Sequence, residues 1–519
     1  MDIIEVEIFN KLFSAIAEEM GIVLQRSAFS SNIKERRDFS CAIFAANGEL
    51  VAQAAHIPVH LGAMPATMNH VLAQLNPAAG DVIITNDPFG GGSHLPDITL
   101  LAPVTDAAGA TLFHVACRAH HADVGGKTPG SMGFCHHIDD EGVLIPPTRL
   151  LQGGKTNKQF LREFLAQVRN PEERRGDLRA QEAALSRGRD RLLATVTKYG
   201  SGHLFTVLEE LKDYGERLMA ATIEAIPDGC YRANDILDDD GLDSAPLDLA
   251  VELTIKGEGA LVDFCASCDQ VTTPLNGVRA VTVSATMYCL QCLLGEGYPI
   301  NHGTQRPITI ITRPGSILDA THPSPVAAGN VETSQRVVDL LFKALAQALP
   351  QRVPAASCGS MNNIAIGDVG CGERFTYYET IGGGMGGAPK GPGASGIHSH
   401  MTNTLNTPVE ALEHSFPLQI KRYELRHGSG GKGAQGGGCG LIRSYEFLED
   451  AHLSLLAERR RSRPYGLQGG NAGRPGCDMW QKKGGERVRL AGKANIEVAE
   501  GDVVTIMTPG GGGWGEGEE

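Results

Sequence analysis

Glycine is concentrated in the last third of this chain, and its clustering there limits the folds available to that region. The sequence holds 65 glycines in 519 residues, and 31 of them lie within 382–519, in clusters such as 382–384 and 510–513. Short apolar runs, for example 441–442 and 503–506, separate the clusters. The glycines follow no three-residue period and 42% of all residues are hydrophobic, which excludes a collagen-like or low-complexity chain. The pattern predicts short strands joined by tight turns, in which glycine supplies positive φ angles.

The rest of the chain shows the periodicities of both helices and strands. Four isoleucine and leucine residues spaced four apart, from Ile4 to Ile16, predict an opening helix with these side chains on one apolar face. Alternating apolar residues predict a strand over 247–255. We also expect helices within 157–226, 277–295 and 334–348, and a β-hairpin with an Asn-Gly turn at 38–52.

These patterns predict a multi-domain protein of the mixed α/β (α+β) class. The sequence Pro-Asp-Gly at 227–229 ends a helical stretch and marks the first expected boundary. We expect an N-terminal α+β domain with a helical segment at 1–226, a middle α/β domain at 227–350, and a Gly-rich, β-rich C-terminal domain at 351–519.

The charge and hydropathy of the chain exclude several classes of function. There are 60 acidic and 46 basic residues, which gives a net charge of −14 and disfavours nucleic acid as the main partner. No run of about 18 apolar residues exists that could span a membrane, and the N-terminus lacks a signal-like pattern. The prediction is a soluble, cytoplasmic protein that binds neither nucleic acid nor membrane.

Histidine is concentrated early in the chain, with nine of the 17 histidines between residues 56 and 137. Two stretches share a His-x-x-Asp pattern, one at His94 and Asp97 and the other at His120 and Asp123, and each lies next to a predicted strand. Imidazole and carboxylate are the usual ligands of Mn, Fe and Zn, and a small ligand set leaves coordination positions open for water or substrate. The alternative is that these histidines end strands and bond to backbone atoms. Spacing alone leaves both interpretations open.

Other motifs carry less information. Cys265-x-x-Cys268 and Cys289-x-x-Cys292 approach the spacing of a four-cysteine zinc site, but the second pair lies in an apolar stretch without turn residues, which favours buried thiols. The chain shows neither a P-loop nor a serine-hydrolase motif. The basic run at 459–463 is typical of a solvated face, with an anion-binding or subunit-contacting edge as the alternative.

Several long stretches, spread over nearly the whole chain, resemble the B subunits of the N-methylhydantoinase/5-oxoprolinase (hydantoinase B) family, whose relatives include acetone and acetophenone carboxylase subunits. Two of them are Asn-Asp-Pro-Phe-Gly-Gly-Gly-Ser-His-Leu-Pro-Asp at 86–97 and Asn-Val-Glu-Thr-Ser-Gln-Arg at 330–336. The others lie at 36–40, 56–64, 118–126, 129–132, 398–408 and 508–513.

The resemblance implies a site and a partner. It implies a divalent metal (Zn, Mn or Fe) held by His94, Asp97 and either His120 or His121, of which we favour His120. Asp38 is a further candidate ligand, and His56, His60 and Asp123 are candidates for ligands or for groups that orient them. His121 or Asp123 would serve as the catalytic base. A hydantoinase A-type, actin-like ATPase subunit would bind ATP and join this chain in a heterodimer or heterotetramer.

Three hypotheses of function follow. In the leading one, the chain is the B subunit of an ATP-dependent hydrolase of cyclic amides such as a hydantoin, 5-oxoproline or another lactam. The partner would phosphorylate the amide oxygen, and the metal site here would activate water to attack the carbonyl carbon. In the second, the chain belongs to an ATP-dependent ketone carboxylase whose metal stabilises an enolate. In the third, it is a non-catalytic scaffolding subunit with a structural metal.

Overall fold

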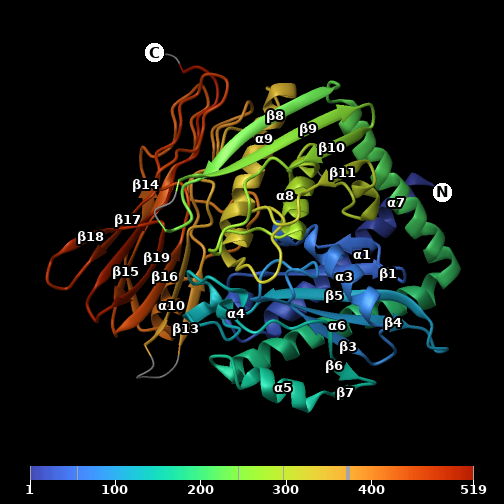
Figure 1. The fold of residues 1–519 in the computed structure, drawn as a ribbon. Coiled ribbons are helices and arrows are strands. Elements are labelled where there is room, and N and C mark those ends of the chain that lie inside the picture. Colours follow the sequence, from blue (N-terminus) through green and yellow to red (C-terminus); the bar gives the residue numbers. More distant parts are fainter. Residues whose placement is uncertain (1, 55, 243–244, 296, 370–374, 518–519) are drawn as a thin grey trace.

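The computed structural model describes residues 2–54, 56–242, 245–295, 297–369 and 375–517. Figure 1 shows three groups of elements: an N-terminal sheet with helices, a middle sheet with helices, and a C-terminal pair of sheets coloured orange to red. The mixed α/β, multi-sheet class expected from the sequence is confirmed. The division into three domains at 226 and 350 remains a prediction, because one hydrophobic cluster runs through both the N-terminal and the middle elements.

The N-terminal sheet has seven strands, each antiparallel to its neighbours, in the order β2-β1-β5-β4-β3-β6-β7. The predicted hairpin at 38–52 is confirmed as β1 and β2. Side chains alternate between the two faces, and because both faces are covered, Ile43 lies in one hydrophobic cluster while Ala42 and Phe44 lie in another. The strands are β1 (Phe39–Ala45), β2 (Leu50–Gln53), β3 (Val82–Thr85), β4 (Asp97–Thr105), β5 (Thr111–His120), β6 (Thr148–Gln152) and β7 (Lys155–Thr156).

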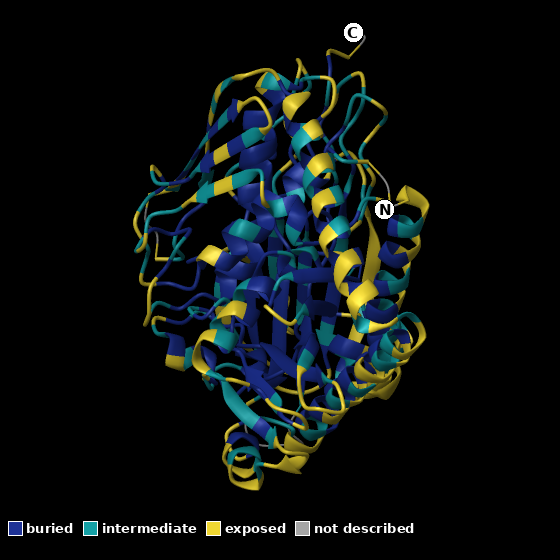
Figure 2. Cartoon of the chain, turned by 90° about the vertical axis from the view of Figure 1, so that its right-hand side faces the viewer, coloured by how far each residue is buried: buried dark blue, intermediate teal, exposed yellow. Residues whose placement is uncertain are grey.

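Helices cover both faces of this sheet. Helices α1 (Ile3–Ser27) and α6 (Pro171–Tyr199) pack together against one face, and α3 (Ala63–Gln74) covers the other. The opening helix was predicted correctly, but its buried face was not, since Ile4 and Ile8 are 65% and 56% exposed. The remaining helical segments are α2 (Ser31–Lys34), η1 (Pro58–His60), η2 (Pro129–Ser131), α4 (Ile138–Glu141), α5 (Lys158–Leu165) and α7 (Ser201–Glu224). Figure 2 shows exposed residues on the outer sides of the long helices and in loops, over a buried interior.

The middle elements begin with a four-stranded sheet in the order β11-β10-β9-β8. The predicted alternating strand at 247–255 is β9, and its residues Leu249, Val251, Leu253 and Ile255 are buried. The strands are β8 (Gly229–Leu237), β9 (Leu247–Lys256), β10 (Gly259–Asp263) and β11 (Ile308–Ile311). The helices are α8 (Arg279–Gln291), η3 (His302–Gln305), the π-helical turn η4 (Gly329–Thr333) and α9 (Ser334–Ala348).

The C-terminal part contains two sheets that share a hydrophobic cluster, with Ile364 and Leu453 on one sheet and Tyr445 and Val504 on the other. The first sheet has the order β13-β12-β16-β19 and the second β14-β15-β20-β17-β18. Their elements are β12 (Asn363–Asp368), β13 (Thr376–Glu379), α10 (Val409–Ser415), β14 (Leu418–Arg426), β15 (Gly440–Phe447), β16 (Ala451–Leu456), β17 (Cys477–Gln481), β18 (Arg487–Leu490), β19 (Lys493–Val498) and β20 (Val503–Met507).

The clustered glycines serve a different purpose from the one predicted. Of the 31 glycines after residue 381, only Gly396, Gly428, Gly469, Gly485, Gly501 and Gly515 have positive φ. Most of the others lie in segments packed directly against another backbone: a Cβ at Gly386 would overlap the carbonyl of Ala355, and a Cβ at Gly438 would overlap that of Ala394. Backbone hydrogen bonds such as Gly387 N to Gly512 O (2.8 Å) join these segments. Glycine is needed here because the segments are too close for any side chain.

The basic run at 459–463 is only partly the solvated face that was predicted, since Arg461 and Arg463 are exposed but the first two arginines are buried. Arg459 and Arg460 are 2% and 7% exposed. Arg459 pairs with Asp235 (2.9 Å) and Arg460 with Asp478 (2.8 Å). They belong to a buried charge network that joins the middle elements to the C-terminal sheets, and it consists of Asp235, Asp238, Asp239, Arg336, Asp339, Glu458, Arg459, Arg460, Asp478 and Lys493.

Within the part of the chain that the structure describes, none of the helices combines the length and the apolar character needed to cross a bilayer.

Candidate functional site: a buried histidine and aspartate centre

A small cavity of about 20 Å³ lies where the N-terminal sheet, the turn η4 and the C-terminal sheets meet. Three of its acidic and imidazole groups come from adjacent strand ends: Asp38 immediately precedes β1, Asp97 begins β4 and His120 ends β5. Asp97 pairs in register with His120, and the His120 backbone N–H donates to the Asp38 carbonyl at 3.0 Å. His60 of η1 and His94, from the loop before β4, complete the group. The antiparallel order β1-β5-β4 therefore brings together residues that are far apart in sequence.

Several nitrogen and oxygen atoms of this group that could bind a metal have no hydrogen-bond partner. Nε2 of His94, Oδ1 of Asp97 and Nε2 of His120 are buried and make no hydrogen bond, and Nδ1 of His94 has only an ion-pair contact with Asp97. The other carboxylate oxygen of Asp97 lies 3.2 Å from both His60 Nε2 and His94 Nδ1 and also accepts a hydrogen bond from Ser93. Buried polar atoms are rarely left unpaired unless they serve an ion, a water or a ligand. Free imidazole nitrogens and carboxylate oxygens are the atoms that bind Mn, Fe or Zn.

Burial controls the protonation of these groups. It lowers the pKa of His60, and it lowers the pKa of His120 well below the usual value, so both rings are neutral, the form that a metal requires. Burial raises the pKa of Asp38 to about 6 against the opposing effect of Arg36. Burial would also raise the pKa of Asp97, but the His94 and His60 rings hold it well below its usual value.

The metal itself remains a prediction. Among the described residues, no three His, Cys, Asp or Glu side chains are already placed around one ion position. The donor types and the unbonded atoms nevertheless fit a divalent ion. The cysteine pairs add nothing to this picture, since Cys289 lies inside α8 and its thiol contacts the Val338 carbonyl.

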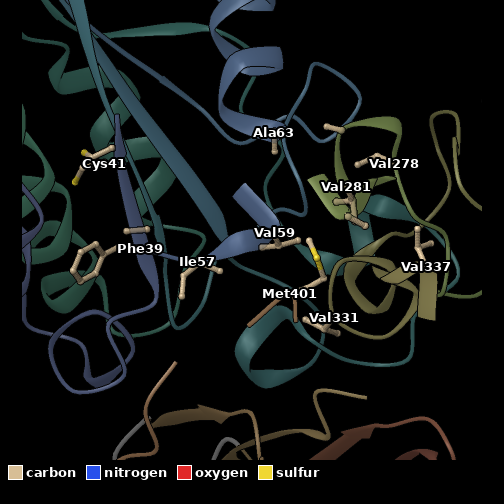
Figure 3. Close-up of a cluster of buried hydrophobic side chains, with 14 of the residues drawn as sticks. Phe39, Cys41, Ile57, Val59, Ala63, Val278, Val281, Val331, Val337 and Met401 are labelled. Atoms are coloured by element: carbon tan, nitrogen blue, oxygen red, sulfur yellow. The ribbon is translucent and has the colours of Figure 1, made fainter. Parts of the chain in front are cut away.

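The remaining residues that line the cavity were not predicted as site residues from the sequence. The polar ones are Asn330, Tyr378, Thr380 and Thr402, and the apolar ones are Ile57, Val59, Val331, Met361 and Met401. Figure 3 shows Val59, Val331 and Met401 grouped as part of this apolar lining. The His120 ring stacks on Tyr378 with centroids 4.6 Å apart, which fixes the ring's orientation.

Asn330 is the most informative of the missed residues. It is 4% exposed, and its side-chain oxygen has no hydrogen-bond partner. It lies in the π-helical turn η4, a feature that is often found at functional sites. The only available signal was its place in the family-like stretch 330–336, which did not indicate a role.

Three other candidates lie outside the cavity. His121 Nε2 is 3.0 Å from Gln181 Oε1 and packs toward α6. Asp123 forms an ion pair with Arg169 (2.9 Å) and accepts backbone N–H bonds, so it stabilises a loop. His56 Nδ1 accepts from the Cys41 N–H at 3.2 Å and lines a neighbouring pocket. The structure thus brings together Asp38, His60, His94, Asp97 and His120, and separates from them the residues predicted as the catalytic base.

Strained backbone surrounds the same cavity. Arg37, Asn362 and His400 have left-handed φ angles of 56°, 52° and 57°, and each directly adjoins a residue that lines the cavity. Left-handed conformations are costly for residues other than glycine and tend to cluster at functional sites.

The fold and this centre together define a mixed α/β protein with a buried histidine and aspartate site. A family model described as hydantoinase B/oxoprolinase matches residues 2–517. The chain belongs to the hydantoinase B/oxoprolinase family, as its resemblance implied.

Relatives and solved structures agree with this assignment. The chain is 39% identical to 5-oxoprolinase 1 of Arabidopsis thaliana, over 99% of this chain but 42% of that protein. It is 31% identical to the B subunit of a putative D-/L-hydantoinase from a Pseudomonas species, over 99% of this chain and 90% of that one. The chain therefore spans about two fifths of the 5-oxoprolinase and nearly all of the hydantoinase chain.

Two solved structures share the fold. One is the ATP-dependent caprolactamase of Pseudomonas jessenii, with a TM-score of 0.91, 26% identity, and coverage of 99% of this chain and 91% of that chain. The other is a nucleotide-free acetone carboxylase, also with a TM-score of 0.91 but 17% identity, covering 99% and 76% of the two chains. At that identity the second likeness shows the fold alone.

Proposed function

We propose that this chain is the hydrolytic subunit of an ATP-dependent hydrolase of cyclic amides and acts with an ATP-binding partner subunit. The buried centre of Asp38, His60, His94, Asp97 and His120, with its unbonded donor atoms, is the observation that carries the proposal. The caprolactamase and 5-oxoprolinase relatives support the substrate class. The chain shows no P-loop, which is in keeping with ATP bound by the partner.

Asp38, His94, Asp97 and His120 would hold a divalent Zn, Mn or Fe ion. When bound, the ion would polarise a carbonyl oxygen and lower the pKa of water. His60 is in this account a positioning residue: its Nε2 lies 3.2 Å from Asp97, and its Nδ1 lies 2.8 Å from Ser40 Oγ, so it fixes the carboxylate.

The other lining residues of the cavity would hold the amide. Asn330 and Thr402 offer hydrogen-bonding groups to an amide N–H or carbonyl, and the apolar side chains of Val59, Val331 and Met401 would pack against ring methylene groups. These apolar groups also exclude bulk water, so that polar contacts inside the cavity strengthen.

The test is an assay of this chain expressed together with its partner subunit. We expect hydrolysis of at least one of 5-oxoproline, hydantoin and caprolactam that depends on ATP and on both subunits, and a divalent metal that copurifies with this chain. Turnover by the purified chain without partner or ATP would contradict the two-subunit account. Failure of the complex on every cyclic amide would contradict the substrate class.

One alternative is a ketone carboxylase, the activity of the carboxylase subunits that the family-like stretches of the sequence resemble. The same complex would then consume ATP when given a ketone and bicarbonate, and not when given a lactam alone. Comparing ATP turnover under these two conditions separates the alternatives.

A further inference from the structure

The buried centre is closed to a substrate. Its cavity of about 20 Å³ holds roughly one water molecule and not a cyclic amide. A substrate must therefore reach the centre from a neighbouring space, through a part of the wall that can move.

One pocket adjoins the centre directly. It has a volume of about 240 Å³ and is lined by Glu18, Gly21, Ile22, Gln25, Arg37, Phe39, His56, Asn403 and Leu405. We call it the outer pocket. Three of these residues are sequence neighbours of residues that line the buried cavity: Arg37 precedes Asp38, His56 precedes Ile57, and Asn403 follows Thr402. The two spaces therefore share the short backbone segments at 37–38, 56–57 and 402–403.

The separating wall is held by a few hydrogen bonds. The Asn403 side chain donates to the His56 carbonyl at 3.0 Å, and the Leu405 N–H donates to the Arg36 carbonyl at 3.0 Å. On the inner side, the Val59 N–H donates to the Met401 carbonyl at 3.3 Å. The segment 401–405 therefore contributes to both spaces, and a hydrogen bond between Thr404 Oγ1 and Thr380 Oγ1 (2.9 Å) also holds it.

The outer pocket contains a cation with no partner. Arg37 is exposed, and its guanidinium makes no ion pair or hydrogen bond to any other described residue. Arg37 has a left-handed φ of 56° and immediately precedes Asp38, which lines the buried cavity. The acid in the same pocket, Glu18, lies 3.6 Å from His56. A guanidinium presents a rigid fork of donors that suits carboxylate and phosphate oxygens.

We propose that the outer pocket binds an oxyanion carried by the substrate, held by Arg37, as the substrate passes to or from the buried centre. This inference rests on the proposed function and identifies the chemical class that the pocket takes. The oxyanion has two possible sources: a carboxylate on the ring, as in 5-oxoproline, or the phosphate of the activated amide. Both present the same chemistry to Arg37, and binding assays can distinguish them.

The test measures binding by calorimetry to the metal-free chain, so that no anion can bind a metal. The probes are inorganic phosphate, 5-oxoproline, and 2-pyrrolidinone, which has the same ring without the carboxylate. We expect at least one oxyanion to bind and Arg37→Gln to weaken it about tenfold, the loss typical of a charged hydrogen bond, while Arg37→Lys restores part of the affinity. Arg26→Gln, which removes an exposed arginine of α1 outside the pocket, should leave binding unchanged.

The outcomes identify the source or overturn the proposal. Binding of 5-oxoproline but not of 2-pyrrolidinone, lost in Arg37→Gln, indicates the carboxylate. Binding of phosphate that depends on Arg37, with both rings equally weak, indicates the activated amide. If neither oxyanion binds the unchanged chain, or if Arg37→Gln binds as well as Arg26→Gln does, the outer pocket is not an oxyanion site. None of these results depends on turnover by the complex. The turnover assay therefore tests the proposed function independently of the binding assay.

Discussion

The C-terminal third and the buried centre both place polar groups out of contact with water, but they treat them in opposite ways. In the buried charge network, each carboxylate faces an arginine, a lysine or a backbone N–H; Glu458, for example, accepts from Arg336 at 3.2 Å and pairs with Lys493. The glycine segments likewise bond their peptide groups to one another. The Nε atoms of Arg336 and Arg459 in the network make no hydrogen bond, but both guanidinium groups pair with carboxylates through their other nitrogens. In the buried centre, by contrast, Oδ1 of Asp97 and the Nε2 atoms of His94 and His120 make no hydrogen bond.

This difference distinguishes buried polar groups that stabilise the fold from buried polar groups that are available to a ligand. A buried charge with its partners in place is neutral or modestly favourable to folding, and removing one partner is what destabilises the protein. A buried group without partners raises the free energy of the folded state, and proteins retain such groups where a ligand or a reaction needs them. Substitutions in the charge network should therefore reduce stability more than activity. Substitutions in the buried centre should reduce activity more than stability.

The largest loss of stability is expected in the charge network. Glu458→Ala leaves Arg336 and Lys493 buried without their shared carboxylate, and the free energy of unfolding should fall by about 3–5 kcal/mol. The matched control is Glu446→Ala, which removes a pair with the half-exposed Lys421 and should cost less than about 1 kcal/mol. Urea denaturation followed by circular dichroism measures both. Equal losses in the two variants would mean that the buried network is not structural.

The next largest effect is expected among the packed glycines. In Gly386→Ala the new methyl group would overlap the Ala355 carbonyl, so the free energy of unfolding should fall by about 1–3 kcal/mol or more. Gly391, five residues away, has open space around its Cβ position and no positive φ. Gly391→Ala should leave stability unchanged or raise it by up to about 1 kcal/mol. A loss of the same size at Gly391 would show that backbone freedom, rather than close packing, explains the glycine.

The same contrast explains what the sequence could predict. The hairpin, the long helices and the alternating strand β9 follow from local periodicity, and His94, Asp97 and His120 could be grouped because they flank predicted strands. The charge network could not be predicted, because the partners of Arg459 lie more than 100 residues earlier, at Asp235 and Asp339. A run of arginines looks solvated until those carboxylates are placed beside it. The close packing of glycine segments is equally non-local, as are the contributions of Asn330, Tyr378 and Thr380 to the centre.

In the buried centre, stability and function should separate. Asp38 is ionised above a pKa of about 6, raised from 3.8 mainly by burial, so its charge lowers the stability of the folded state as the pH rises through this range. Asp38→Asn removes the ion pair with the buried Arg36 (3.6 Å). The free energy of unfolding of the metal-free protein at pH 7.5 should still be unchanged or higher, because burial of the Asp38 charge outweighs that pair and Arg36 keeps its bonds to Asn32, Tyr378 and Thr380. The stability of the variant should also fall less between pH 4 and pH 6 than that of the unchanged chain.

The same Asp38→Asn variant should bind no divalent metal and should abolish amide hydrolysis by the complex, as elemental analysis and turnover assays would show. A loss of stability comparable to that of Glu458→Ala would place Asp38 among the structural charges. Full metal content with full activity would exclude it from the ligands.

The smallest effect on folding is expected at Asn330, whose side-chain oxygen has no hydrogen-bond partner to lose. Asn330→Ala should change the free energy of unfolding by less than about 1 kcal/mol. If the Asn330 oxygen accepts the ring N–H of the substrate, kcat/KM for a lactam should fall about 10- to 100-fold, the loss expected for an unmade buried hydrogen bond. An N-methyl lactam lacks that N–H, so the substitution should scarcely affect its hydrolysis. Metal content should stay the same, because Asn330 comes from the turn η4 and is not one of the proposed ligands. An equal fall for both substrates would mean that Asn330 shapes the cavity without recognising the amide, and the unbonded oxygen would then need a different ligand.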